Sequence, residues 1–370
     1  MSTIAHVKIP YLPLSETFIY QRLINLRRYR GLVITDRELQ NLDIYPYPKI
    51  YHLSEIHNLG DFLLSQGVTA IHAHFGTGGI RVLAAQRKTG LPLLTSFHGV
   101  DVSSRPRQNP EYRLQLPQLF TQSTLCAAVS DYMKIQLINL GCPREKIVVI
   151  KSGIDLSKFP YSPPRLPCNG SLTLLSIGRL KEKKGMHLLI PAFARLSHLY
   201  PKARLLIGGE GGQKKKLMRL VNDLGLAQSV FFLGPLSHQE VRVQLAQATI
   251  FVLACTTASD GDQEGIPNVL MEAMASGLPV VAADHTGISE LVSQGKTGLL
   301  AREGNIQDLA YKMSLLLANT HLWPAMTAAA RRKVEQEHDI VKQAAKLEVA
   351  YDFLLSANHS GTLPLPSSLK

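Results

Sequence analysis

The chain alternates short β-rich runs with stretches that have the periodicity of amphipathic helices, and this alternation limits the possible folds more than any other feature. In the first part of the chain, the β-rich runs include AIHAHF (70–75), PLLTSFHG (92–99) and KIVVIKSG (146–153). Strands that are separated by helices form a parallel sheet with helices on both faces. The first part of the chain is therefore predicted to be a doubly wound α/β domain.

The alternation stops once and then begins again. Residues 161–170 read YSPPRLPCNG, and prolines block both helix continuation and the hydrogen bonds of a strand. Five β-rich runs follow this break: SLTLLSIG (171–178), ARLLIGG (203–209), VFFLG (230–234), TIFVLA (249–254) and LPVVAA (278–283). We expect two Rossmann-like domains that face each other across a cleft, over 1–165 and 166–340. A C-terminal helix over 341–356 that can return to the first domain and a flexible tail over 357–370 complete the expected organisation.

The cysteines and the hydropathy of the chain favour the cytoplasm. The four cysteines are scattered and form no CxxC pair, which argues against a zinc cluster or a disulfide framework: Cys126, Cys142, Cys168 and Cys255. No stretch approaches the roughly 20 apolar residues of a membrane-spanning helix, and the N-terminus has no basic segment followed by an apolar one. We expect a protein that is neither exported nor integral to a membrane.

The net charge is +12 and is unevenly distributed. Residues 1–165 carry 19 basic and 11 acidic side chains, a net charge of +8, which leaves +4 for the rest. Nucleic acid, an anionic bilayer and phosphorylated ligands all favour such a surface. Nucleic acid is the least favoured partner, because only 6% of the residues are aromatic and could stack on bases.

Two glutamates flank the segment GIPNVLM, and Pro267 suits the first turn of a helix that runs to about Ser276. The N-terminus of that helix could bind a diphosphate through its free amides, and Glu272 could accept hydrogen bonds from ribose hydroxyls. Eight residues of helix would separate the carboxyl groups of Glu264 and Glu272 by roughly 12 Å. A glycosidase pair needs about 5 to 9.5 Å, so hydrolysis by these two carboxylates is disfavoured.

Further polar groups follow other predicted strands. Arg179 and Lys184, in GRLKEKKG, suit a diphosphate leaving group because both are cations at the end of a strand. His98, Gly99 and Asp101, in SFHGVD, suit hydrogen bonds to sugar hydroxyls. GGEGG (208–212) does not complete the GxGxxG dinucleotide fingerprint, but its glycines would let the chain pass close to a nucleotide.

Taken in order, SFHGVD, SIGRLKEKKG, GGEGG and DGDQEGIPNVLMEAMASGLPVVA resemble glycosyltransferase family 4, whose members are retaining enzymes of GT-B fold. The resemblance implies that Arg179 and Lys184 bind the donor diphosphate, that Glu272 binds the ribose and that Glu264 contacts the donor sugar near its reacting carbon. It places His98 beside the donor sugar, with Asp101 shaping the same wall. The catalytic candidates are therefore Glu264, His98, Arg179 and Lys184. The remaining donor-contact candidates are Gly209, Gly211, Leu236, Gly265, Ile266, Pro267, Asn268, Val269 and Glu272.

The N-terminal segment PYLPLSETFIYQRL resembles a subset of the family that builds bacterial exopolysaccharides of the colanic acid type. This subset lacks the glycine-rich first loop of other members, so the acceptor side is the least defined. Glu16 is an acceptor-side candidate, together with His98, Gly99 and Asp101.

The hypothesis from the sequence is a retaining hexosyltransferase that uses a UDP- or GDP-sugar, needs no metal and acts on a saccharide acceptor, most simply a lipid-linked one. Four arginines of the first domain could attract it to the inner face of the cytoplasmic membrane: Arg22, Arg27, Arg28 and Arg30. The alternatives are a sugar-nucleotide epimerase or a phosphorylase of the same fold, and a non-catalytic protein that binds phosphate or nucleic acid. Product analysis separates them, because only transfer joins a sugar to an acceptor alcohol.

Overall fold

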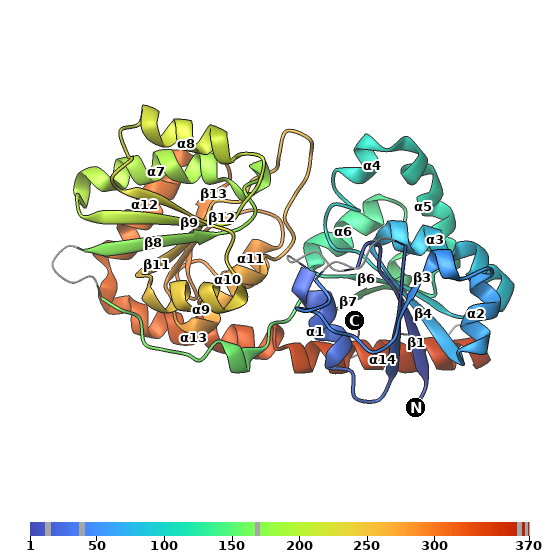
Figure 1. Ribbon diagram of the computed structural model, residues 1–370. Helices are drawn as coiled ribbons and strands as arrows, with labels where there is room; N and C mark the ends of the chain where they lie inside the picture. The colour runs from blue at the N-terminus through green and yellow to red at the C-terminus, as the bar shows by residue number, and fades with distance from the viewer. Residues whose placement is uncertain (12–15, 37–40, 167–170, 361–364, 367–368, 370) are drawn as a thin grey trace. The chain divides into compact units, whose positions relative to one another are not determined.

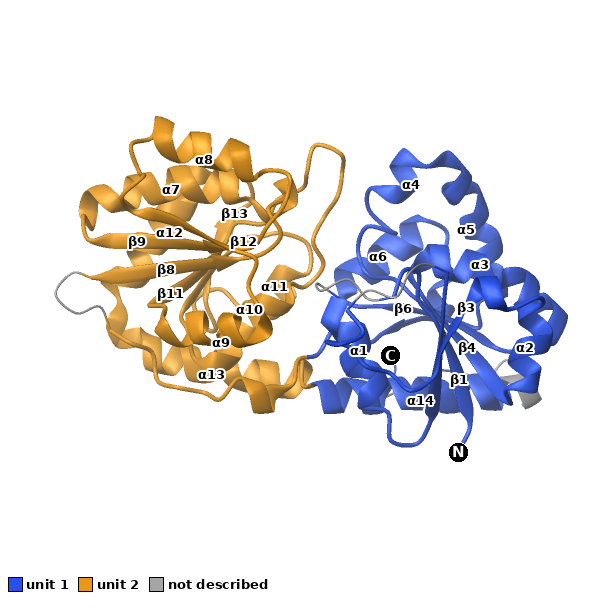
Figure 2. Cartoon of the chain, in the orientation of Figure 1, with its two compact units in different colours: residues 1–153, 340–370 blue, residues 154–339 orange. Residues whose placement is uncertain are grey.

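The computed structural model describes the 370-residue chain except for residues 12–15, 37–40, 167–170, 361–364, 367–368 and 370. It consists of two compact units (Figure 2). Unit 1 contains Met1–Gly153 and Ile340–Lys370, and unit 2 contains Ile154–Asp339. The boundary thus falls earlier than the expected residue 165, because Ile154 and Phe159 are buried in a hydrophobic cluster of unit 2. Cys168 and part of the expected linker lie outside the described residues.

Unit 1 is built on a seven-stranded parallel sheet with the order β3-β2-β1-β4-β5-β6-β7 (Figure 1). Strands β4, β5 and β7 lie within the β-rich runs predicted from the sequence or overlap them. The strands are β1 Thr3–Val7, β2 Arg30–Thr35, β3 Ile50–His52, β4 Val68–His74, β5 Leu93–Ser96, β6 Leu125–Ala128 and β7 Ile147–Val149.

Helices cover both faces of this sheet. One face packs against α2, α3, α5 and α6 through a cluster that includes Leu63, Val82 and Leu119. The other face packs against α14, through Leu347, Tyr351 and Leu354. The helices of unit 1 are α1 Thr17–Ile24, α2 Leu59–Ser65, α3 Phe75–Thr89, α4 Arg105–Gln108, α5 Pro110–Gln122, α6 Asp131–Asn139 and α14 Ile340–Ser360.

Unit 2 repeats the design on a six-stranded parallel sheet with the order β10-β9-β8-β11-β12-β13. The five β-rich runs predicted after the break correspond to β8, β9, β10, β11 and β12. The strands are β8 Leu172–Ile177, β9 Ala203–Gly208, β10 Val230–Gly234, β11 Ile250–Leu253, β12 Val280–Asp284 and β13 Leu299–Arg302.

Two hydrophobic clusters attach the helices of unit 2 to its sheet. One joins α7, α8 and α12 to one face, and the other joins α9, α10, α11 and the C-terminal half of α13 to the opposite face. Ser237 and Glu240 form a capping box at the start of α9. The helices are α7 Met186–Leu199, α8 Lys214–Asp223, α9 His238–Gln247, α10 Asn268–Ser276, α11 Ile288–Leu291, α12 Ile306–Ala318 and α13 Trp323–Glu337.

The strand order reverses once in each sheet, between β1 and β4 in unit 1 and between β8 and β11 in unit 2. In open parallel sheets, ligands bind outside the carboxyl ends of the strands at such a switch point. A ligand site of unit 2 is therefore expected in the segments that follow β8 and β11. In unit 1 it is expected in the segments that follow β1 and β4.

Helix α14, near the C-terminus, belongs to unit 1 and extends further than expected. Helix α14 begins at Ile340 and continues to Ser360, beyond the predicted end at residue 356. Within the expected tail, Leu369 is 1% exposed and lies in the same cluster as α14, whereas residues 361–364, 367–368 and 370 lie outside the described part of the chain. In the part of the chain that the structure describes, no helix is both long enough and apolar enough to cross a membrane.

Candidate active site

The switch point of unit 2 brings together three residues that the sequence singled out. Arg179 follows β8 directly and is exposed, and Lys184 ends the short 3-10 helix Glu182–Lys184. Glu264 lies between β11 and α10, and its Oε2 is 2.7 Å from Nζ of Lys184. The structure thus joins a candidate diphosphate ligand and the candidate sugar contact in one ion pair.

The ion pair fixes the charge of both partners. Burial alone would raise the pKa of Glu264, but Lys184, Lys183 and Arg179 outweigh it and lower this pKa to about 2. Burial likewise favours a neutral Lys184, but Glu264 overcomes this effect and the pKa of Lys184 is raised. Glu264 is therefore a carboxylate at neutral pH, and Lys184 is an ammonium ion.

Lys183 and Asp262 also belong to this cluster, and the sequence analysis missed both. Lys183 Nζ donates to Asp262 Oδ1 at 3.0 Å and to the carbonyl of Gln263 at 3.1 Å, and it lies 3.9 Å from Glu264 Oε2. These contacts tie the loop of Glu264 to the turn that carries Lys184. The local sequence does not indicate this contact, because Lys183 and Asp262 are 79 residues apart.

The glycine-rich loop after β9 packs directly against the loop of Arg179. Gly209 has φ +129°, and a Cβ there would lie 2.0 Å from the carbonyl oxygen of Gly178, so only glycine fits. The amide of Leu180 donates to the carbonyl of Glu210 at 2.8 Å. Gly211 and Leu236 contact the same region, since added Cβ atoms at Gly211 and Gly208 would meet Leu180 and Leu236. Gly209, Gly211 and Leu236, which the sequence analysis predicts to contact the donor, therefore lie next to the turn that carries Arg179.

Helix α10 begins just after Glu264. Pro267 is its N-cap, no side chain caps its first turn and that turn contains no acidic residue. Gly265, Ile266 and Pro267 are buried, whereas Asn268 and Val269 are half-buried. Among the described residues, the amides of Asn268 and Val269 have no acceptor, whereas that of Leu270 donates to the carbonyl of Pro267 at 3.1 Å. The first two amides of the helix can therefore bind an anion.

Glu272 lies one turn further along α10 and is half-buried. Burial raises the pKa of Glu272 to about 7, against the opposing charge of Arg242. This carboxyl group is thus close to half-protonated at neutral pH. It can donate a hydrogen bond to a ribose hydroxyl as well as accept one.

In unit 1, His98 follows β5 and is surrounded by aromatic rings. Its ring centroid lies 4.9 Å from that of Phe18, 4.7 Å from that of Phe75 and 5.8 Å from that of His74. Among the described residues, neither ring nitrogen of His98 has a hydrogen-bond partner. Burial, together with Arg22 and Lys8, lowers the pKa of His98 well below its usual value, so the ring is neutral. A neutral imidazole has one donor and one acceptor nitrogen, but both are buried here, so a sugar hydroxyl can reach them only if the surrounding side chains move.

Asp101 holds the backbone and does not face a ligand, which corrects the expected hydrogen bonding to a sugar. Its side chain is 0% exposed, and its carboxylate accepts the amides of His98 and Gly99 at 3.0 Å and that of Gly76 at 3.2 Å. Asp101 therefore fixes the loop that presents His98, and Gly99 contributes a backbone amide to this arrangement.

Glu16 is engaged in an ion pair, because its Oε2 lies 2.8 Å from Nζ of Lys8. Lys8 is buried, donates to the carbonyl of Pro10 at 2.9 Å and lies 5.0 Å from the ring centroid of Phe75. The pair lies at the carboxyl end of β1, beside the switch point of this sheet. The adjoining residues 12–15 lie outside the described part of the chain.

Three buried histidines lie together behind these residues. His6, His72 and His74 have ring nitrogens within 4.8 Å of one another, a spacing at which a metal ion can be considered. Both nitrogens of His72 are already engaged, by Tyr351 Oη at 2.7 Å and by Ser96 Oγ at 2.8 Å. The nearby Arg22 would repel a cation, since its charge contributes to the lowered pKa of His72 and His74. We therefore interpret the cluster as a neutral, hydrogen-bonded part of the core.

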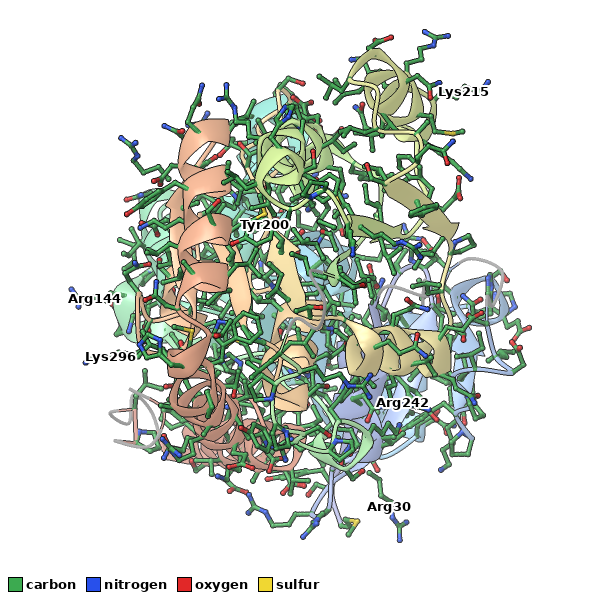
Figure 3. All side chains as sticks on the ribbon, turned by 90° about the vertical axis from the view of Figure 1, so that its left-hand side faces the viewer. Arg30, Arg144, Tyr200, Lys215, Arg242 and Lys296 are labelled. Carbon is green, nitrogen blue, oxygen red and sulfur yellow. The ribbon has the colours of Figure 1, made fainter. Side chains whose placement is uncertain are left out.

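Two of the four arginines expected to attract a membrane are committed elsewhere. Arg22 is 2% exposed and donates to the carbonyls of Ile150 and Lys151 at 2.9 Å, so it cannot reach a bilayer. Arg28 pairs with Glu348 and Asp352 of α14. Arg27 and Arg30 are exposed, and the side chain of Arg30 extends into solvent (Figure 3). Sequence position alone could not separate the buried arginine from the exposed ones.

Comparisons with known proteins agree with this arrangement. The family model for glycosyl transferases group 1 matches residues 164–333, and that for Glycosyltransferase Family 4 matches residues 25–158. The chain is 38% identical over 286 residues to the putative colanic acid biosynthesis glycosyltransferase WcaL of Escherichia coli K12, covering 75% of this chain and 68% of WcaL. It is 36% identical over 285 residues to the amylovoran biosynthesis glycosyltransferase AmsK of Erwinia amylovora, covering 74% of this chain and 68% of AmsK.

Solved structures share the fold. Anabaena Alr3699/HepE in complex with UDP and glucose matches with a TM-score of 0.81 and 21% identity, over 95% of this chain and 100% of that one. The sucrose-phosphate synthase of Thermosynechococcus elongatus matches with a TM-score of 0.80 and 17% identity, over 96% and 100% of the two chains. Two Rossmann-like units of this kind define the GT-B fold. The chain belongs to glycosyltransferase family 4, and its relatives include exopolysaccharide-type members of that family.

Proposed function

We propose that the protein transfers a hexose from a nucleoside-diphosphate sugar to a hydroxyl of a saccharide acceptor, with retention of anomeric configuration, in the synthesis of a bacterial exopolysaccharide. The observation that carries the proposal is the cluster of Arg179, Lys184 and ionised Glu264 at the switch point of unit 2. The names of WcaL and AmsK support the exopolysaccharide assignment. The UDP and glucose named for the Anabaena structure support a nucleotide-sugar donor.

In the proposed reaction, the acceptor oxygen bonds to the anomeric carbon as the bond from that carbon to the diphosphate breaks. The acceptor proton passes to a phosphate oxygen, and the products are a glycoside and a nucleoside diphosphate. Arg179 and Lys184 stabilise the negative charge that develops on the diphosphate, and the first-turn amides of α10 add to this effect. Glu264 hydrogen-bonds the donor sugar, and Glu272 holds the ribose.

Lys184 must exchange partners during this reaction. Without donor it lies 2.7 Å from Glu264, and with donor we propose that its ammonium group turns to the diphosphate. Glu264 is then released to accept hydrogen bonds from the sugar. One ion pair thus keeps two buried charges compensated until the substrate replaces it.

We propose that unit 1 binds the acceptor through the surroundings of His98. Phe18 and Phe75 can contact the apolar face of a sugar ring, and the neutral His98 can bond a hydroxyl once the surrounding side chains move. Glu16 forms an ion pair with Lys8 and thereby stabilises the end of β1. It would contact the acceptor only if an acceptor hydroxyl inserted between the two side chains.

The direct test is transfer from UDP- or GDP-hexose to a saccharide acceptor, with the anomeric configuration of the product read by proton NMR. Glu264→Gln should lower kcat by about 10²- to 10³-fold, the range found for a lost charge-stabilising group. Arg179→Ala should mainly weaken nucleoside-diphosphate binding. The exposed Lys181→Ala in the same loop is the control. Normal kinetics in both site variants would contradict the site, and donor turnover without a glycoside product would favour an epimerase.

We propose that the reaction needs no metal ion, because Arg179, Lys184 and the helix amides supply positive charge to the leaving group. Transfer should therefore persist in excess EDTA. A loss of activity that added magnesium or manganese restores would contradict this part of the proposal.

We propose a lipid-linked acceptor at the cytoplasmic face of the membrane. Arg22 is buried, and Arg28, although exposed, is paired with Glu348 and Asp352. The exposed Arg27 and Arg30 remain, and at about 1 kcal/mol each they would give weak, salt-sensitive binding. Co-sedimentation with phosphatidylglycerol vesicles at low salt should therefore be slight and should decrease in the Arg27→Gln/Arg30→Gln variant. Sedimentation that does not change in this variant would exclude these arginines as the membrane contact.

A further inference from the structure

The loop that follows β12 holds both backbone groups of Glu264. His285 Nε2 lies 3.4 Å from the amide nitrogen of Glu264 and accepts its proton. Thr286 Oγ1 donates to the carbonyl oxygen of Glu264 at 2.5 Å. Two adjacent side chains thus fix the peptide units on either side of the residue that carries the carboxylate.

Thr286 reaches this position only in an unfavourable backbone conformation. Its φ is +48°, in the left-handed region that β-branched residues rarely occupy. Gly287 follows directly and would adopt that region more easily. Strained residues of this kind persist where the surrounding structure requires them, often at functional sites.

His285 is oriented from its other side by a carboxylate. It is 1% exposed, and its Nδ1 lies 2.9 Å from Oε2 of Glu303, which follows β13, as a close electrostatic contact and not an aligned hydrogen bond. Because Nε2 accepts the Glu264 amide, it carries no proton, and the proton of the neutral ring is on Nδ1, beside the carboxylate. Glu303 therefore selects the tautomer that can hold Glu264.

Glu303 also fixes the other end of the loop that contains Glu264. Its Oε1 accepts the amide of Thr257 at 2.6 Å and the hydroxyl of Thr256 at 3.2 Å. These contacts, together with the one to His285, lower the pKa of Glu303 against the effect of its partial burial. One carboxylate thus holds residues 256–257 directly and Glu264 through His285.

We propose that His285 is a positioning residue, which together with Glu303 and Thr286 sets the carboxylate of Glu264 for its contact with the donor sugar. This inference rests on the proposed role of Glu264. Among the described residues, His285, Thr286 and Glu303 form no hydrogen bond or ion pair with Arg179 or Lys184, so their loss should affect turnover more than nucleotide binding. Two residues thus have different effects on Glu264. Lys184 keeps its carboxyl group ionised, whereas His285 fixes the position of its backbone.

Three variants test the proposal by their effect on kcat. His285→Leu removes both polar contacts and should lower kcat about 30-fold or more, with the Kd for the nucleoside diphosphate changed less than about 3-fold. His285→Gln keeps an acceptor for the Glu264 amide and should recover much of this loss. Thr286→Ala should lower kcat more mildly. His338→Leu is the matched control, because His338 is also buried in unit 2 but outside this cluster.

A double variant shows whether His285 acts through Glu264. If it does, His285→Leu should lower kcat by less than about 3-fold further in the Glu264→Gln background. A full additional 30-fold loss would overturn the proposal, as would normal kcat in both His285→Leu and Thr286→Ala. If His285→Leu does not fold, His285→Gln and Thr286→Ala still decide, since both preserve packing. Normal kinetics of Glu264→Gln alone would contradict the proposed site itself, so the two failures can be told apart.

Discussion

At the scale of single residues, the ion pair of Lys184 and Glu264 should be more important for catalysis than for folding. Breaking a buried ion pair leaves an unpaired buried charge, at about 3 to 5 kcal/mol, whereas replacing both partners by apolar residues is often neutral. Lys184→Met should therefore lower the thermal stability of the protein clearly, and Lys184→Met/Glu264→Leu should restore much of it. Both variants should lack transfer activity. Thermal unfolding followed by circular dichroism gives the first result and the transfer assay gives the second.

Two outcomes would contradict this account of the pair. Unchanged stability in Lys184→Met would mean that Glu264 finds another cation, and Lys183 at 3.9 Å is the nearest candidate. Activity in the double variant would mean that neither charge is needed for transfer.

Glu272 makes the stability of unit 2 depend on pH in a defined direction. Its pKa is about 7 in the folded state against 4.5 for an unperturbed glutamate, so the folded state retains a proton that the unfolded chain releases. Stability is therefore unaffected below about pH 4.5, falls as the pH rises toward 7 and stays reduced above it. Glu272→Gln should remove this loss, which is about 1 to 3 kcal/mol at 1.36 kcal/mol per pKa unit after allowance for partial exposure. Melting temperatures of both proteins at pH 5 and pH 8 provide the test, and an equal difference at both values would contradict it.

At the scale of elements, Asp101 shows how one buried side chain can hold the loop that presents His98. Asp101→Ala would leave the amides of Gly76, His98 and Gly99 without their acceptor, at about 1 to 3 kcal/mol for each buried group that water cannot reach. We expect a large fall in melting temperature, with Asp101→Asn intermediate. Asp61→Ala, which removes an exposed ion pair with Lys88, is the control and should change stability by less than about 1 kcal/mol. Equal stability of Asp101→Ala and the unsubstituted protein would disprove the anchoring role.

The elements were largely predictable from the sequence, and the contacts between their loops were not. Strands such as β7 and β11 follow from local runs of apolar residues, because a strand buried on both faces is a nearly continuous apolar run. The pairing of Lys183 with Asp262 spans 79 residues, and that of His285 with Glu264 spans 21. Such contacts depend on which strands are neighbours in the sheet, and that order is not local information. Arg22 shows the same limit, since an arginine on a short helix gives no sign that it will be buried.

At the scale of the whole molecule, the order of the chain makes unit 1 depend on its last segment. Unit 1 begins at Met1, but the helix that covers one face of its sheet begins at Ile340, after all of unit 2. Strand residues such as Ile4, Leu94 and Val148 are buried in the same cluster as α14. This apolar face of the sheet is exposed to water until α14 packs on it. Unit 2, in contrast, is formed by one continuous stretch of the chain.

A cavity in α14 should therefore loosen unit 1 and leave unit 2 unchanged. Leu354 is 0% exposed, and Leu354→Ala should cost about 2 to 5 kcal/mol, whereas Val341→Ala changes a 40% exposed residue of the same helix and should cost little. Native-state hydrogen exchange read by mass spectrometry should show faster exchange in peptides that contain β1, β4 and β5, with β8, β11 and β12 as slow as before. Nucleoside-diphosphate binding should also be retained, because the proposed donor-binding residues all lie in unit 2. Faster exchange in both units would mean that they unfold together, and the separate donor unit inferred from the chain order would then be wrong.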